Sequence, residues 1–342
     1  MTVTTIQQEM LALAFSADSD FKNPYMGDCI SASACSADIQ TRLAVLNEKL
    51  SKDWQVIWGP ARFSFAILDP NGRHIDNAVF VARDGTTGDY VVAIAGTDLR
   101  SLPDWIFEDF MVGATVPWLF ETGVTPTPRI SLATFTGLTV LLNLSQPCPE
   151  LPGQGQKLLP FLASIPKDQP INLYTTGHSL GGALSPTLAL ALQDRRSDWD
   201  PTEMATVLPY AFAGPTPGDS AFAAYFASRF PNGLQRLWNK LDVVPHAWDV
   251  AHLQEIPDLY GTPAMADMQK LVNGLVAAVQ PRDYAPLNDA QPAFSGQQAP
   301  TAPASFPVFL AEAAYQHITA YVDGFGIDWN CWGDLPKQPS AA

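Results

Sequence analysis

Apolar residues recur at helical spacing in two stretches near the start of the chain. In MTVTTIQQEMLALAFSADSD the apolar positions are spaced as in an amphipathic helix. The same spacing links Ile39, Leu43, Leu46 and Leu50. We therefore predict a second helix over residues 37–52, with Ser36 as its N-cap.

Between residues 63 and 98 the pattern changes to short apolar runs separated by turn residues. The runs are FSFAILD, AVFVAR and YVVAIAG. The segments between them contain NG and DGTTGD, and Asn, Asp and Gly favour tight turns. This region predicts a meander of three strands.

Farther along, helical and strand-like patterns alternate. Helical patterns cover residues 158–165, 183–193, 220–230, 263–279 and 308–321, and strand-like runs cover 171–176, 204–212 and 234–238. Residues 280–307 are rich in Pro, Gln and Ala, which predicts a long irregular loop. Alternating strands and helices predict an α/β fold, with a mostly parallel central sheet and helices on both faces. No linker divides the chain, so we expect residues 1–342 to form a single domain.

The motif Gly-His-Ser-Leu-Gly-Gly at residues 177–182 lies between a predicted strand and a predicted helix. A serine at such a corner is held in a strained backbone conformation that exposes its hydroxyl, the arrangement called a nucleophile elbow. Gly177 and Gly181 leave room for the strand and the helix to pass close together. We predict that Ser179 is a catalytic nucleophile.

A serine hydroxyl needs an adjacent base, and the base needs a group that fixes its tautomer. In α/β-hydrolases these partners follow in the order serine, acid, histidine. Asp242 lies just after a short predicted strand, at the sheet edge where the elbow is expected, so we predict it as the acid. We predict His317 as the base. His246 and His252 are alternatives, although His246 is only four residues from Asp242 and would have to fold back to orient properly.

We predict structural roles for the two other histidines and a catalytic role for two backbone amides. We expect His178 to point away from the hydroxyl with its ring nitrogens hydrogen-bonded, and His74, in the turn NGRHID, to be exposed. The oxyanion of a tetrahedral intermediate needs hydrogen-bond donors. We predict these as the backbone amides of Leu180, just after the nucleophile, and Thr97, after Gly96 at a strand end.

Composition and charge limit the classes of substrate and partner that we expect. The 342 residues contain 34 acidic and 19 basic side chains, for a formal net charge of −15. Such a surface repels phosphate backbones and anionic membranes, so we expect neutral substrates and no nucleic-acid binding. The chain has no basic N-terminal region typical of a Sec signal peptide and no apolar run long enough to span a membrane. We expect a cytoplasmic protein, or one exported by a route other than Sec.

No metal site or cofactor is expected. Four cysteines occur, and they show neither a C-x-x-C motif nor the His-interleaved spacing of a metal site.

Three motifs together resemble the class 3 lipases, the family of fungal triacylglycerol lipases and their plant and bacterial relatives. They are TTGHSLGGAL, YAFAGPTPGDSAFAAYF and NKLDVVP, in this order. The similarity covers roughly residues 78–247 and the region of His317, and it is to a bacterial-type member. The resemblance implies an α/β-hydrolase fold and hydrolysis of carboxylic esters, typically acylglycerols. It places the nucleophile, acid and base on Ser179, Asp242 and His317, and the oxyanion donors on Thr97 and Leu180.

In such lipases a mobile amphipathic lid follows the oxyanion loop. The resemblance therefore implies a lid within residues 99–120, where LPDWIFEDF has an amphipathic pattern. Trp105, Ile106 and Phe110 would cover the acyl pocket when the lid is closed and meet a lipid–water interface when it is open. The alternative is a fixed helix that packs into the core.

The main functional hypothesis is a lipase or carboxylesterase that works through an acyl-enzyme. A phospholipase A1 or a feruloyl-type esterase on the same scaffold is the first alternative. A non-catalytic α/β-hydrolase-like binding protein is the alternative from another class. Labelling of Ser179 by an organophosphonate separates the enzymes from the binding protein.

Overall fold

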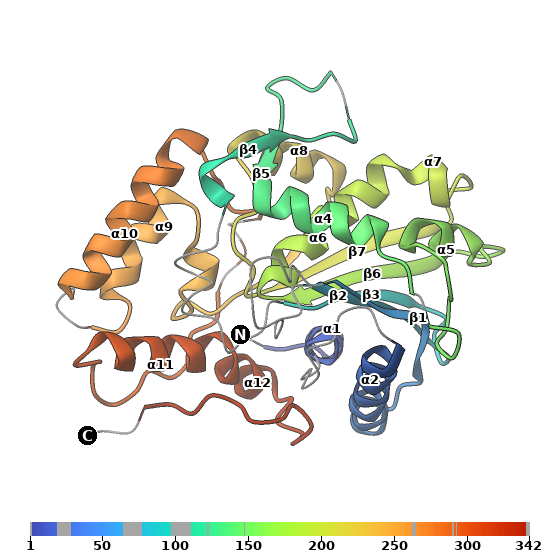
Figure 1. The fold of residues 1–342 in the computed structure, drawn as a ribbon, viewed down its shortest axis with the longest axis horizontal. Helices are drawn as coiled ribbons and strands as arrows, with labels where there is room; N and C mark the ends of the chain where they lie inside the picture. Colours follow the sequence, from blue (N-terminus) through green and yellow to red (C-terminus); the bar gives the residue numbers. More distant parts are fainter. Residues whose placement is uncertain are drawn as a thin grey trace.

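A six-stranded sheet forms the centre of the computed structural model, in the order β1-β2-β3-β6-β7-β8 (Figure 1). The structure describes residues 2–18, 29–63, 77–96, 111–121, 123–146, 148–261, 265–288, 291 and 293–339. The expected α/β fold is confirmed, since β3, β6, β7 and β8 run parallel and helices cover the sheet. No helix within these ranges is long and apolar enough to cross a membrane.

The first three strands form the predicted antiparallel meander, but the first strand lies earlier than expected. They are β1 Trp54–Phe63, β2 Asn77–Asp84 and β3 Tyr90–Ile94. Of the strand predicted at FSFAILD, the structure describes only Phe63, which is the last residue of β1, and residues 64–69 lie outside the described ranges. β1 contains Gly59 and Pro60, which favour turns, and its register with β2 shifts there. An edge strand tolerates such an irregularity, so pairing with β2 overrides the local signal.

The first two helices are α1 Thr5–Ala17 and α2 Cys29–Leu50. The first was predicted, but the second begins well before residue 37, and Ser36 lies buried inside it rather than at its N-cap. Ile39, Leu43 and Leu46 are fully or almost fully buried, which fits the spacing from which the helix was predicted. The small, Ser-rich segment before them carries no strong helical pattern, and tertiary packing extends the helix through it.

The parallel half of the sheet matches the predicted elements closely. Its strands are β6 Ile171–His178, β7 Ala205–Phe212 and β8 Gln235–Leu237. The helices between and before them are α5 Leu158–Ser164, α6 Leu180–Asp194, α7 Arg196–Trp199 and α8 Ser220–Arg229. Helix α4 Leu132–Asn143 and the short hairpin of β4 Thr115–Pro117 and β5 Arg129–Ser131 were not predicted.

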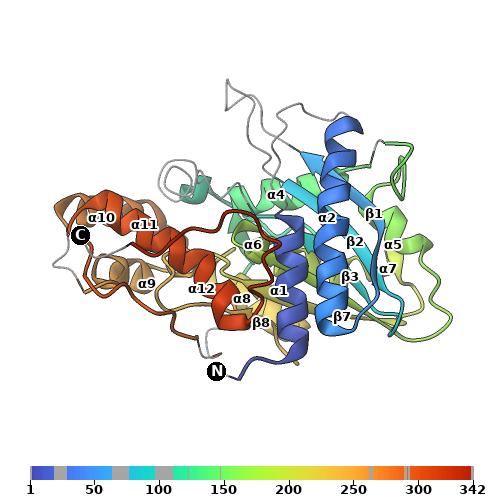
Figure 2. The same ribbon diagram turned by 90° about the horizontal axis from the view of Figure 1, so that it is seen from below.

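Helices cover both faces of the sheet, as Figures 1 and 2 show, and a hydrophobic cluster lies on each face. Alternate residues of β2 point to opposite faces. Val79 and Val81 belong to the core under α4, α5, α6 and α8, whereas Phe80 and Ala82 belong to the core under α1, α2 and α12. The sheet is therefore apolar on both sides, and its strand ends are the places open to chemistry.

The C-terminal third forms a further cluster beside the sheet. It contains η3 Val244–His246, α9 Val250–Glu255, η4 Ile256–Asp258, α10 Ala266–Val279 and α11 Phe306–His317. The single helix predicted at 308–321 is two helices, because helical backbone geometry is interrupted at Ile318, between α11 and α12 Thr319–Phe325. After the turn η5 Gln280–Arg282, the described residues up to Ser305 form no helix or named strand.

Candidate active site

Ser179 lies at the corner between β6 and α6. Its backbone has φ 58° and ψ −125°, a positive-φ conformation that non-glycine residues adopt at a cost of about 1–3 kcal/mol. The corner is held by two hydrogen bonds, from the Ser179 amide to the Phe212 carbonyl at 3.0 Å and from the Gly182 amide to the Ser179 carbonyl at 2.8 Å. The strained corner expected for a nucleophile elbow is therefore present.

The glycines of the motif are required because a larger side chain would clash with neighbouring backbone. A Cβ at Gly177 would collide with the backbone of Gly181, and a Cβ at Gly181 would collide with the carbonyl oxygen of Ile94. A Cβ at Gly182 would meet the carbonyl oxygen of Phe212 in the same way. These contacts confirm that the glycines let helix α6 approach strands β3, β6 and β7.

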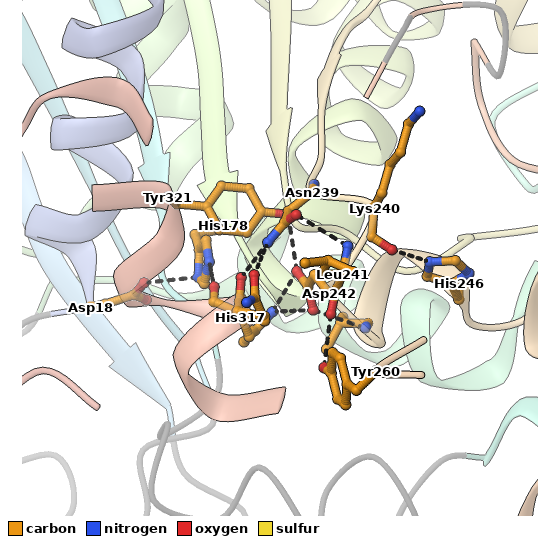
Figure 3. Close-up of polar contacts among 12 residues, drawn as sticks. Asp18, His178, Asn239, Lys240, Leu241, Asp242, His246, Tyr260, His317 and Tyr321 are labelled. Atoms are coloured by element: carbon orange, nitrogen blue, oxygen red, sulfur yellow. Dashed lines mark hydrogen bonds and ion pairs between the residues drawn. The ribbon is translucent and has the colours of Figure 1, made fainter. Parts of the chain in front are cut away.

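Asp242 and His317 meet although 75 residues separate them in sequence (Figure 3). Asp242 follows β8, and His317 is the last residue of α11. Nδ1 of His317 lies 2.9 Å from Oδ2 and 3.0 Å from Oδ1 of Asp242, and both side chains are wholly buried. An ionised carboxylate only accepts, so Nδ1 carries the proton and Nε2 is left as an acceptor. Nε2 is buried and has no hydrogen-bond partner within the described residues.

Further donors fix the Asp242 carboxylate. The Val244 amide donates to Oδ1 at 3.0 Å, and the Tyr321 hydroxyl donates to Oδ2 at 2.9 Å. Burial and the neighbouring Asp242 raise the pKa of Tyr321 well above its usual value. The hydroxyl therefore keeps its proton and stays a donor at ordinary pH.

Asn239 ties this carboxylate to the histidine helix. Its amide N–H donates to the Tyr321 hydroxyl at 3.0 Å, and its Nδ2 donates to the carbonyl of Gln316 at 3.0 Å. The Asn239 side-chain oxygen accepts from the Leu241 and Gly296 amides. Sequence analysis missed Tyr321 and Asn239 as site residues. The available signals were a tyrosine one helical turn after His317 and an asparagine in the motif NKLDVVP.

The alternative histidines lie elsewhere. Both ring nitrogens of His246 face backbone carbonyls, of Lys240 at 3.1 Å and of His252 at 3.2 Å. Nδ1 of His252 lies 3.8 Å from Asp249. Within the described part of the chain, the structure pairs Asp242 with His317 and with neither alternative.

His178 differs from expectation in one respect. Its Nε2 lies 2.8 Å from the carbonyl oxygen of His317, as expected for a hydrogen-bonded ring. Its Nδ1, however, has no hydrogen-bond partner among the described residues and lies 3.9 Å from a carboxyl oxygen of Asp18. The prediction that both ring nitrogens are satisfied is therefore wrong.

Of the two predicted oxyanion donors, the structure describes Leu180 but not Thr97. Leu180 is the first residue of α6, so its amide has no acceptor within the helix. Thr97 lies outside the described residues, but Gly96 before it lies against the elbow. A Cβ on Gly96 would come within 3.1 Å of the Ser179 Cβ and 2.9 Å of the His178 carbonyl oxygen.

The predicted lid residues Trp105, Ile106 and Phe110 lie outside the described residues, as does His74. Of residues 99–120, the structure describes 111–120, which contain the short helix η2 Met111–Gly113 and strand β4. Within the ranges that the structure describes, no group of three or more His, Cys, Asp or Glu side chains is placed to hold a metal ion.

Comparisons with known proteins agree with the motifs. Residues 153–251 match the family model described as lipase (class 3). A solved structure titled M37 lipase is 29% identical, with 94% of this chain and 93% of that chain covered and a TM-score of 0.80. Lipase II from Rhizopus niveus is 18% identical, with 73% and 77% covered and a TM-score of 0.45, and we draw nothing from that likeness. No curated protein sequence matches.

Proposed function

We propose that this member of the class 3 lipase family, a serine hydrolase of esters, acts on acylglycerols and other neutral esters through Ser179, His317 and Asp242. Family membership and the hydrolase class follow from the match over residues 153–251 and the similarity to M37 lipase. The roles of individual residues and the substrate class are the proposal.

The observation that carries the proposal is the buried hydrogen bond between Asp242 and His317, with Nε2 of His317 left unpartnered. Asp242 fixes the tautomer in which Nε2 can accept the hydroxyl proton of Ser179. The serine oxygen then attacks the ester carbonyl, and the imidazolium returns its proton to the departing alcohol. Water hydrolyses the acyl-enzyme by the same route in reverse.

The developing oxyanion requires donors that are already in place. We propose the amides of Leu180 and Thr97 for this role, because Leu180 begins α6 and Gly96 brings the end of β3 to the elbow. Loss of one such donor lowers turnover by about 100- to 1,000-fold in comparable sites.

Neutral esters fit the charge of the molecule. At a formal charge of −15 the protein repels anionic headgroups, which favours acylglycerols over anionic phospholipids. We propose that residues 99–120 form a lid over the acyl pocket, with Trp105, Ile106 and Phe110 meeting the lipid–water interface.

The test combines labelling with a substrate series. We expect an organophosphonate to label Ser179 stoichiometrically and to abolish hydrolysis of p-nitrophenyl esters and of a triacylglycerol emulsion. Ser179→Ala should remove both labelling and hydrolysis. Ser185→Ala is the matched control, because Ser185 is a buried serine of α6, the helix that follows Ser179, and its hydroxyl donates to the Tyr210 carbonyl.

Other outcomes identify other functions. Labelling with hydrolysis of phospholipid but not triacylglycerol would replace the proposal with a phospholipase A1. A preference for feruloyl esters would replace it with a feruloyl esterase. No labelling of the folded protein would favour a non-catalytic binding protein.

A further inference from the structure

A second buried carboxyl–imidazole pair, Asp18 and His178, lies beside His317 (Figure 3). Asp18 follows the last residue of α1, and His178 is the last residue of β6, next to Ser179. Oδ2 of Asp18 lies 3.9 Å from Nδ1 of His178, with the two side chains 7% and 0% exposed. Neither of these two atoms has a hydrogen-bond partner among the described residues.

The other two polar atoms of the pair, Oδ1 of Asp18 and Nε2 of His178, form hydrogen bonds to two parts of the active site. Oδ1 of Asp18 accepts the backbone N–H of Gly96, the residue before Thr97. Nε2 of His178 lies 2.8 Å from the carbonyl oxygen of His317. A carbonyl only accepts, so Nε2 of His178 carries a proton and donates it there.

The two atoms that face each other, Oδ2 of Asp18 and Nδ1 of His178, therefore need a proton between them. If His178 is neutral, its Nδ1 presents a lone pair toward Asp18, and an ionised Asp18 would present another. Two buried acceptors facing each other repel, because no water compensates them. One proton must lie on the Asp18 carboxyl or on Nδ1.

The local environment favours the carboxyl. Burial raises the pKa of Asp18 to about 7, although the Gly96 N–H and the Arg42 guanidinium favour its anion. Burial and the nearby His317 lower the pKa of His178 well below its usual value. Below about pH 7 the pair is then a neutral acid and a neutral imidazole.

We infer that Asp18 and His178 are positioning residues, which as a neutral pair connect the oxyanion strand at Gly96 to the backbone of the base His317. This inference rests on the proposed function. Neutrality matters because the rings of His178 and His317 lie 4.6 Å apart. A charge on His178 would oppose the imidazolium that His317 becomes when it takes the serine proton.

The charged and titratable groups around the pair come from helices α2, α11 and α12 and from the loop after β8. Arg42 of α2 donates to the Phe15 carbonyl and pairs with Asp38. His317 of α11 is bonded to Asp242, and the Tyr321 ring of α12 lies 5.4 Å from the His178 ring.

The sign of the pH effect follows from the raised pKa. The folded state holds a proton on Asp18 up to about pH 7, whereas the unfolded state releases it near pH 3.8. Stability from this group is therefore full below pH 3.8 and is lost as the pH rises to about 7. Turnover should also fall above pH 7, because the ionised carboxyl then faces the Nδ1 lone pair of His178, and the repelling pair no longer holds Gly96 and His317 in place.

The decisive variant is Asp18→Asn. Its amide oxygen can accept from Gly96 and its NH₂ can donate to Nδ1 of His178, so it imitates the protonated carboxyl at every pH. We expect its kcat on a soluble p-nitrophenyl ester to stay within about threefold of wild type at pH 6. Wild type should lose at least about threefold in kcat between pH 7 and 9, and Asp18→Asn should not.

Two further variants complete the design. Asp18→Leu has similar size but neither accepts nor donates, and it should lower kcat about tenfold at pH 6 with little change in KM. Asp38→Asn removes a partly exposed carboxylate near the same Arg42 and should leave the pH profile unchanged. Asp18→Asn as inactive as Asp18→Leu, or with the wild-type alkaline decline, would overturn the inference.

Unfolding measurements decide the question without reference to catalysis. Between pH 4 and 7 the unfolding constant of wild type should rise at least about tenfold more than that of Asp18→Asn. Parallel curves would refute the buried proton. Failure of the proposed function is distinct, because wild type itself would then hydrolyse no ester and take no organophosphonate label.

Discussion

Replacing Tyr321 with Phe tests how much the acid of the site depends on its supporting hydroxyl. That hydroxyl donates to Oδ2 of Asp242 at 2.9 Å and accepts from the Asn239 amide at 3.0 Å, and both partners are wholly buried. A hydrogen bond to a charged group contributes about 1.5–3 kcal/mol, and a neutral one about 0.5–1.5 kcal/mol. Since Phe keeps the ring packing, we expect Tyr321→Phe to lower the free energy of unfolding by about 2–4 kcal/mol.

The effect on turnover should be smaller than loss of the acid. Asp242 keeps the Val244 amide and Nδ1–H of His317 as donors in this variant. We expect kcat to fall about tenfold, whereas loss of the acid's charge in a Ser-His-Asp site costs about 10,000-fold. The measurements are urea unfolding and kcat on a soluble short-chain ester, normalised to the number of sites that an organophosphonate labels.

Tyr315→Phe is the matched control. Its hydroxyl donates to Asp323 at 3.2 Å in an exposed position, so its loss should change stability by less than about 0.5 kcal/mol and leave kcat unchanged. If Tyr321→Phe behaved like this control in both assays, the hydroxyl would not support Asp242, and the reasoning from its buried hydrogen bonds would be refuted.

Three further predictions concern the elbow, the base and the lid. Gly181→Ala should abolish folding or most activity, because the added Cβ would collide with the Ile94 carbonyl. Gly274→Ala is the control: this glycine lies inside α10 with open space around it, so the change should raise the free energy of unfolding by about 1 kcal/mol. Thermal unfolding of both variants is the measurement. His317→Ala should lower turnover at least about a thousandfold, while His246→Ala should keep turnover per labelled site within a few-fold, and equal losses would move the base to His246. Trp105→Ala should lower hydrolysis of emulsified long-chain esters more than that of soluble short-chain esters, and equal losses on both would remove the lid hypothesis.

The sequence by itself determined the elements whose cause is local. The motif at residues 177–182 defines the elbow because only glycine fits where α6 crosses β3, β6 and β7. The alternation of Val79, Phe80, Val81 and Ala82 defines a strand buried on both faces because side chains along a strand point to opposite sides. The order of Ser179, Asp242 and His317 along the chain likewise predicted the acid and the histidine that the structure brings together.

Tertiary structure decided what depends on segments far apart in the chain. The break at Ile318, which separates His317 from the helix of Tyr321, has no turn residue to announce it. The early start of α2 and the irregular strand β1 follow from packing that outweighs weak local preferences. Asp18 meets Gly96 and His178 only because α1 ends at the sheet edge beside the elbow. Burial at that place raises the pKa of the Asp18 carboxyl, and no local pattern of residues encodes that burial.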